Sequence, residues 1–154
     1  MMEMQVIVFR VGEENYGIDV NYIKGIEKLI PIVRVPTSVP HIKGIINLRG
    51  KVIPVMSLRS KFNLPLQADT DNTRLLLVSY DDMDVALLVD EVMEIENVAE
   101  KNYFDTPIIV KSADTGYVKG IINNGDTLII MIDHASLISV EEQSKMKDII
   151  SEDE

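Results

Sequence analysis

The chain of 154 residues contains no cysteine, which excludes both a disulfide framework and a thiolate metal site. It also lacks a secretory signal, because the N-terminal residues MMEM are not a basic region followed by an apolar stretch. The longest apolar runs, such as LIIMI at 128–132, have the length of a strand and are far shorter than a membrane span. We therefore expect a cytoplasmic protein with no direct membrane insertion.

Motifs of catalysis and of cofactor binding are also missing from the sequence. It contains no GxGxxG, Walker A loop, GxSxG or HExxH motif. Its two histidines, His41 and His134, are far apart, and no acidic ligands stand beside them at metal spacing. The run DDMD at 81–84 lacks the glycine and the distal glutamate of an EF-hand loop, and we interpret it as a hairpin turn. We predict that the chain is not an enzyme and holds neither a metal nor a cofactor.

The net charge of −10 argues against a nucleic-acid partner, because phosphate contacts require clustered lysine and arginine. The charge is unevenly distributed. Residues 1–62 contain nine basic and five acidic residues, whereas residues 63–154 contain six and twenty. The excess of basic residues within 1–62 has two interpretations that the sequence leaves open: a solvated face, or a surface that steers a partner.

The apolar pattern is that of short strands. About ten runs of strand length alternate or are rich in β-branched residues, and each ends in Gly, Asn, Asp or Pro. This spacing predicts an all-β fold of barrels or a sandwich. The best helix candidate is residues 139–150, where Ser139 and Glu142 can form a capping box.

An internal repeat organises the chain. Residues 41–62 match residues 117–138 at seven of 22 positions, and the block KGIIN occurs in both. Upstream, residues 9–28 resemble residues 78–97, so the offset grows from 69 to 76 and we expect about seven additional residues near 99–112. A half of this size buries too little surface to be stable alone, so we expect two copies that share a core. The predicted turn residues of the repeat are Gly44, Gly50, Gly120 and Gly125.

Two features distinguish candidate functional residues from the repeated frame. Val20, Ile23 and Ile26 recur every three residues after a predicted strand, with counterparts at Val89, Val92 and Ile95. These six are either core residues or the lining of a groove between the two copies. Arg49 stands at a predicted hairpin tip where the second copy has glycine, so the turn does not require an arginine.

Taken together, the motifs make the chain similar to the CheW family of bacterial chemotaxis coupling proteins. The resemblance rests on GEENYGIDV, IKGIINLRGKVIPVMSLRSKF, VALLVDEV, VKGII and LIIMID, and it extends from about Gln5 to Val140. It implies an all-β fold of two pseudo-symmetric five-stranded SH3-like β-barrels with short helices. The implied CheW-like domain is 1–142, with barrels at about 8–70 and 71–140 and an N-terminal strand crossover. Residues 143–154 would form the end of a C-terminal helix and an acidic tail.

The resemblance also implies a function. Proteins of this family are non-catalytic adaptors that link the cytoplasmic tips of transmembrane chemoreceptors to the regulatory domain of the histidine kinase CheA. The chain length implies the stand-alone coupler, which receptors would recruit to the inner face of the membrane. The receptor-binding groove carried over by position consists of Val20, Ile23, Lys24, Ile26, Arg49 and Val89.

The sequence departs from the family pattern at two positions. Gly25 replaces a glutamate that many relatives carry, and Ser57 replaces an aspartate. Two alternative functions stay open: coupling of a receptor–kinase array outside chemotaxis, and sensing of a small ligand in the groove between the barrels.

Overall fold

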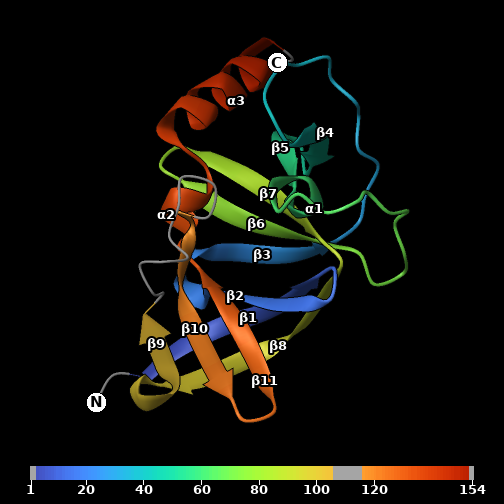
Figure 1. Ribbon diagram of the computed structural model, residues 1–154. Helices are drawn as coiled ribbons and strands as arrows, with labels where there is room; N and C mark the ends of the chain where they lie inside the picture. The colour runs from blue at the N-terminus through green and yellow to red at the C-terminus, as the bar shows by residue number, and fades with distance from the viewer. Residues whose placement is uncertain (1–2, 106–115, 153–154) are drawn as a thin grey trace.

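The computed structural model describes residues 3–105 and 116–152. Strands form two sheets, one of six strands and one of five, with short helices at their ends (Figure 1). The strands are β1 (Glu3–Val11), β2 (Glu14–Asp19), β3 (Ile23–Lys28), β4 (Ile42–Leu48), β5 (Lys51–Ser57), β6 (Arg74–Tyr80), β7 (Met83–Val89), β8 (Glu91–Ala99), β9 (Tyr103–Asp105), β10 (Val118–Asn124) and β11 (Thr127–Ile132). The predicted all-β class is confirmed.

The internal repeat is visible in the order of the strands. The five-stranded sheet has the order β3-β6-β7-β5-β4, and the six-stranded sheet has the order β8-β1-β2-β11-β10-β9. Strands that correspond in the repeat occupy corresponding places, and each sheet contains one parallel pair, β5–β7 or β2–β11. The additional strand, β9, lies in the stretch where the change of offset predicts extra residues; residues 106–112 of that stretch lie outside the described part of the chain.

Each sheet takes strands from both halves of the chain. Strands β1 and β2 join β8 to β11, while β3, β4 and β5 join β6 and β7. The chain therefore crosses between the sheets twice, at the 3-10 turn η1 (Val20–Tyr22) and at Asp90. The boundary predicted near residue 70 does not separate one sheet from the other, and as a boundary of the repeat it stays a prediction.

Three apolar clusters hold this arrangement together. The largest lies between the sheets and contains residues of both, and each sheet has a smaller cluster of its own. Strand β7 is buried on both faces: Val85 and Leu87 face the shared cluster, whereas Ala86 and Leu88 face the cluster of the five-stranded sheet. This follows from the alternation of side chains along a strand. Neither sheet could bury its shared face alone.

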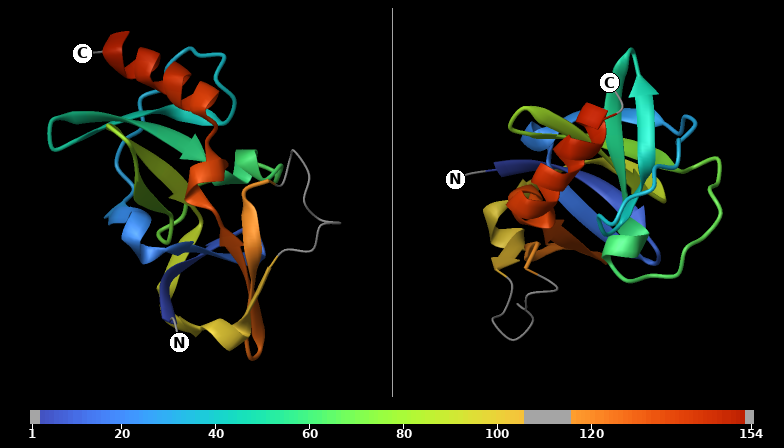
Figure 2. Two further views of the ribbon diagram at one scale, coloured as in Figure 1. Left: turned by 90° about the vertical axis from the view of Figure 1, so that its left-hand side faces the viewer. Right: turned by 90° about the horizontal axis from the view of Figure 1, so that it is seen from above.

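Helix α3 (Val140–Glu152) packs beside β5 at the end of the five-stranded sheet (Figure 2). The predicted capping box forms: the backbone N–H of Glu142 donates to Ser139 Oγ, and that of Ser139 donates to Glu142 Oε1, both at 3.0 Å. Met146 and Ile149 are buried against the shared cluster. The other helices are α1 (Leu58–Lys61), α2 (His134–Leu137) and the 3-10 turn η2 (Glu100–Asn102). Residues 153 and 154 of the predicted acidic tail lie outside the described residues.

The predicted turn glycines divide into two groups. Gly50 and Gly125 lie in the β4–β5 and β10–β11 turns with φ of 84° and 78°. Gly44 and Gly120 lie inside β4 and β10, at register shifts, and not in turns. A Cβ at Gly44 would overlap the carbonyl oxygen of Val33, and one at Gly120 would lie 2.6 Å from that of Phe104. Their role is to let another segment approach the strand closely.

Candidate functional site: the two crossings between the sheets

The residues predicted to line a groove gather at the two crossings. Val20 and Ile23, on either side of η1, are half-buried and pack against the shared cluster. Val89 and Val92 stand in the corresponding places around Asp90. Val92 is half-buried, but Val89 is only 1% exposed and belongs to the shared cluster itself. The alternatives that the sequence left open therefore divide by position: Val89 is a core residue here, and the others reach the surface.

Strand β3 carries the exposed part of the predicted groove. It lies at one end of the five-stranded sheet, and its residues alternate between half-buried and exposed. Ile26 is 42% exposed, which is high for an isoleucine in a strand that packs on a core. The matching strand of the other sheet, β8, also lies at an end and exposes Met93 and Ile95. Each sheet thus presents apolar side chains along one edge strand.

Lys24 belongs to a charged cluster at the end of the five-stranded sheet. Its Nζ lies 3.0 Å from Asp84 Oδ2, and Lys51 Nζ lies 2.9 Å from the same oxygen. The side chain of Asp84 lies on the same face of β7 as Ala86 and Leu88, because alternate residues of a strand face the same side. Burial alone would raise the pKa of Asp84, but the hydrogen bonds and charges of Lys51 and Lys24 outweigh it and keep the pKa below its usual value. Sequence reasoning missed this ion-pair cluster, because it joins residues up to 60 positions apart.

Arg49 lies at the tip of the β4–β5 hairpin with its side chain 73% exposed. Its Nη2 lies 3.3 Å from Glu27 Oε1, so the tip of the hairpin contacts β3. The backbone of Arg49 has φ of 52°, a left-handed conformation that disfavours a side chain. At the other tip Asn124 donates to Glu96 of β8, so each hairpin reaches the edge strand of its own sheet. The first tip carries the positive charge of Arg49, whereas the turn of the second, Gly125-Asp126, carries an acidic residue.

An aromatic cluster that the sequence did not indicate adjoins η1. The ring of Tyr22 stacks on His134 with 3.8 Å between centroids, and Tyr80 lies on the same histidine at 5.3 Å. The hydroxyl of Tyr80 donates to the carbonyl oxygen of His134 at 2.7 Å. Burial lowers the pKa of His134, although Asp133 and Asp19 oppose the shift. This cluster connects the first crossing to helix α2.

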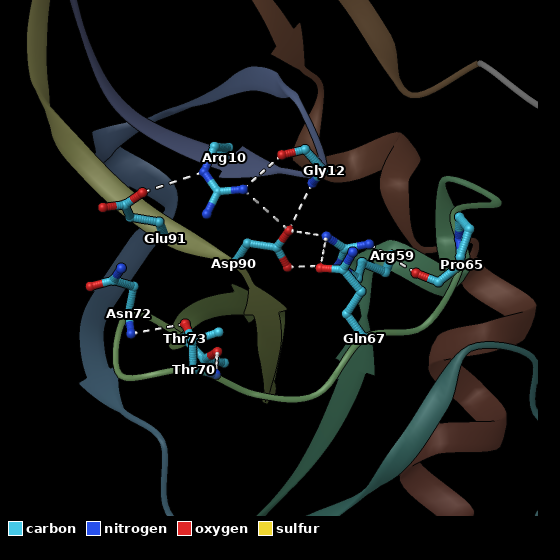
Figure 3. Close-up of polar contacts among 10 residues, drawn as sticks. All are labelled: Arg10, Gly12, Arg59, Pro65, Gln67, Thr70, Asn72, Thr73, Asp90 and Glu91. Atoms are coloured by element: carbon cyan, nitrogen blue, oxygen red, sulfur yellow. Dashed lines mark hydrogen bonds and ion pairs between the residues drawn. The ribbon is translucent and has the colours of Figure 1, made fainter.

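The second crossing is fixed by Asp90 (Figure 3). Asp90 Oδ1 accepts from Arg59 Nε at 2.9 Å, and Oδ2 accepts from Arg59 Nη2 at 2.6 Å. Oδ2 also accepts the backbone N–H of Gly12 at 2.8 Å, and Arg10 Nη1 lies 3.6 Å away. We call Asp90, Arg59, Arg10 and Gly12 the Asp90 clasp. A cavity of about 240 Å³ adjoins it, lined in part by His41, Ser57 and Thr73.

Two kinds of site are absent from the described residues, a metal-binding cluster and a membrane-spanning helix. Within 3–105 and 116–152, no group of three or more His, Asp or Glu side chains could hold a metal ion. No helix in the same part of the chain has the length and apolar character needed to cross a bilayer. What the crossings provide is surface: exposed apolar side chains on edge strands, with charged groups fixed beside them.

Comparison with known proteins identifies relatives over most of the chain. A family model described as a CheW-like domain matches residues 5–142. The chemotaxis protein CheW of Bacillus subtilis (strain 168) is 36% identical over 137 residues, which cover 89% of this chain and 88% of the relative. The chemotaxis protein CheW of Helicobacter pylori is 31% identical over 129 residues, covering 84% and 78%. The crystal structure of the scaffolding protein TtCheW from Thermoanaerobacter tengcongensis matches with a TM-score of 0.82 at 32% identity, covering 92% of this chain and 96% of that one.

Proposed function

Because the chain belongs to the CheW-like family, we propose that it is a non-catalytic chemotaxis adaptor that couples the cytoplasmic tips of chemoreceptors to the regulatory domain of the kinase CheA. The relatives named as chemotaxis proteins support the pathway, and the match to a scaffolding protein supports the absence of catalysis. The observation that carries the proposal is the agreement of motif, sequence and fold over nearly the whole chain. In this role the protein lies in the cytoplasm and reaches the inner face of the membrane through the receptors.

The receptor surface that we propose is the first crossing and the edge strand that follows it. Ile26 is exposed, and Val20 and Ile23 are half-buried beside it, so together they offer an apolar strip. Val89 supports this strip from the core, and Lys24 and Arg49 stand at its charged margin. Apolar contacts supply most of the affinity of such an interface, and charges at its rim fix the orientation of the partner.

A scaffold works by geometry and not by chemistry. If one surface binds the receptor and another binds the kinase, the second binding event takes place at a high effective concentration. The presence of two similar sheets in one chain suits this role, because each sheet can expose an edge strand to a different partner.

The proposal is tested by capture on an immobilised cytoplasmic fragment of a chemoreceptor. We expect Ile26→Asp to abolish capture while the thermal midpoint stays close to that of the parent, because the side chain is already 42% exposed. The matched control is Ile95→Asp, the corresponding residue of β8, which is 57% exposed and should retain capture. Equal loss in both variants, or full capture by Ile26→Asp, would remove β3 from the receptor surface.

A further inference from the structure

The Asp90 clasp connects the two sheets at the crossing that contains no helical turn. We propose that Asp90 and Arg59 are positioning residues, which set the orientation of the two sheets and thereby the shape of the partner-binding surface. The inference rests on the proposed function for its binding consequence, but its structural part is independent of any partner.

The contacts of Asp90 come from both sheets. Arg59 lies in α1, directly after β5 of the five-stranded sheet, and it binds both carboxylate oxygens. Gly12 lies in the turn between β1 and β2 of the six-stranded sheet, and it donates to Oδ2. The backbone N–H of Asp90 also donates to the carbonyl oxygen of Arg10, at 3.0 Å. The side chain and the backbone of Asp90 together thus form hydrogen bonds to both sheets.

The clasp has the geometry of a rigid contact. The side chains of Arg59 and Asp90 are only 13% and 19% exposed, so water screens the pair weakly. The two parallel hydrogen bonds between a guanidinium and a carboxylate restrict both distance and angle. Arg59 is further held by the carbonyl oxygen of Pro65 and the side chain of Gln67, at 2.8 and 2.9 Å (Figure 3).

The charged residues of the Asp90 clasp have no charged counterparts at the first crossing, as the internal repeat shows. Under the repeat, Asp90 corresponds to Asn21, Arg59 to Ala135 and Arg10 to Ser79. These three counterparts carry no charge, so no ion pair of this kind can form among them. Asn21 is exposed, and its backbone N–H donates to Asp19 only two residues away. The arrangement of strands is duplicated in the two sheets, but the Asp90 clasp is not. The clasp is therefore not a requirement of the repeated strand arrangement.

The position of the clasp links it to the binding surface. Asp90 directly follows Val89 and stands two residues before Val92, both of which contact the shared cluster beneath the crossings. A shift of this crossing would move the six-stranded sheet relative to β3, and the apolar strip of Ile23 and Ile26 would lose its fixed surroundings. Substitutions that alter such a two-sheet arrangement without touching the partner typically change binding by about two- to thirtyfold.

The experiment measures the distance between the sheets. Because the chain has no cysteine, Lys28→Cys on β3 and Asn97→Cys on β8 give two unique exposed sites for spin labels. We expect one narrow distance distribution in the otherwise unaltered protein. Asp90→Asn keeps the shape and an acceptor for Gly12 but removes the charge, and Arg59→Lys keeps the charge but removes the paired hydrogen bonds. Both should broaden or shift the distribution at temperatures well below unfolding, whereas the matched control Asn21→Ala should not.

The same variants are measured for binding to a purified chemoreceptor cytoplasmic fragment. We expect Asp90→Asn and Arg59→Lys to bind roughly two- to thirtyfold more weakly, although neither residue belongs to the proposed contact surface. Unchanged distance distributions in the folded variants would overturn the inference, whatever their affinity. If Asp90→Asn does not fold, Arg59→Lys decides the question. A parent protein that fails to bind the receptor would count against the proposed function and leave the distance measurement to decide the clasp.

Discussion

Arg49 is a residue at which the two copies of the repeated hairpin differ both in side chain and in charge. It has φ of 52° at a position where the second hairpin has glycine with φ of 78°. Arginine in the left-handed region is less stable than glycine there by about 1 kcal/mol. A residue kept at such a position despite its conformational cost is a candidate for function.

We therefore predict that Arg49→Gly separates stability from binding. The free energy of unfolding should stay unchanged or rise by up to about 1 kcal/mol, because relief of the left-handed strain is partly offset by the greater freedom of glycine in the unfolded chain. Capture by the receptor fragment should fall. Urea unfolding and capture on the same samples check both statements; a variant that loses stability, or that binds as the parent does, would contradict this role for Arg49.

His134 makes the free energy of unfolding depend on pH in the mildly acidic range. Burial lowers the pKa of His134, so the unfolded chain binds a proton more readily than the folded protein does. The contribution of neutral His134 to the stability of the folded protein is fully present above the unfolded pKa of about 6.5. It is lost as the pH falls through that value towards the folded pKa.

We predict that the free energy of unfolding is lower at pH 5.5 than at pH 7.5, and that His134→Phe reduces this difference while keeping a ring between Tyr22 and Tyr80. Part of the difference should persist, because burial and Lys61 also lower the pKa of His41. Urea unfolding at the two pH values provides the comparison, and NMR titration of the parent gives the pKa of His134 directly. A pKa of 6.5 or above would refute the prediction.

At the scale of elements, β4 and β10 show what the repeated letters KGIIN are for. Each strand has a glycine where a neighbouring backbone approaches, Val33 at Gly44 and Phe104 at Gly120. The glycines are equivalent in the repeat, and so are the close approaches. The repeated motif therefore serves packing: its glycine lets a neighbouring segment lie close against the strand.

We predict that Gly44→Ala and Gly120→Ala each lower the free energy of unfolding by about 2 kcal/mol, because the new methyl group meets rigid backbone. The control is Gly25→Ala in β3, where the nearest atoms would lie 3.5 and 3.8 Å from the new Cβ. That variant should change stability by less than about 0.5 kcal/mol. Thermal or urea unfolding of the three variants is sufficient, and three equal effects would contradict the explanation.

Local patterns in the sequence predicted the elements well, and long-range features poorly. Alternating apolar residues and turn residues predicted the strands, and Ser139 with Glu142 predicted the start of α3, because these signals act within a few residues. The burial of Val89 and the exposure of Ile26 could not be separated, since both depend on which sheet covers which strand. The Asp90 clasp was missed for the same reason: its charged residues lie 31 and 80 positions apart in the chain.

At the scale of the whole molecule, two similar sheets share one core and exchange strands. Such a chain has two related edges, β3 and β8, that differ in their side chains. Lys24 and Arg49 adjoin the first edge, whereas Met93 and Ile95 are exposed on the second. Duplication thus provides the frame, and divergence between the copies can provide separate binding surfaces.

The central claim is that this protein holds a receptor and a kinase together. Its most direct test is the amount of CheA regulatory domain recovered on an immobilised chemoreceptor cytoplasmic fragment as the concentration of this protein increases. A bridge predicts recovery that rises, passes through a maximum and falls when excess protein occupies receptor and kinase separately. Recovery of the kinase domain that is independent of this protein, or that never rises above the level without it, would contradict the account.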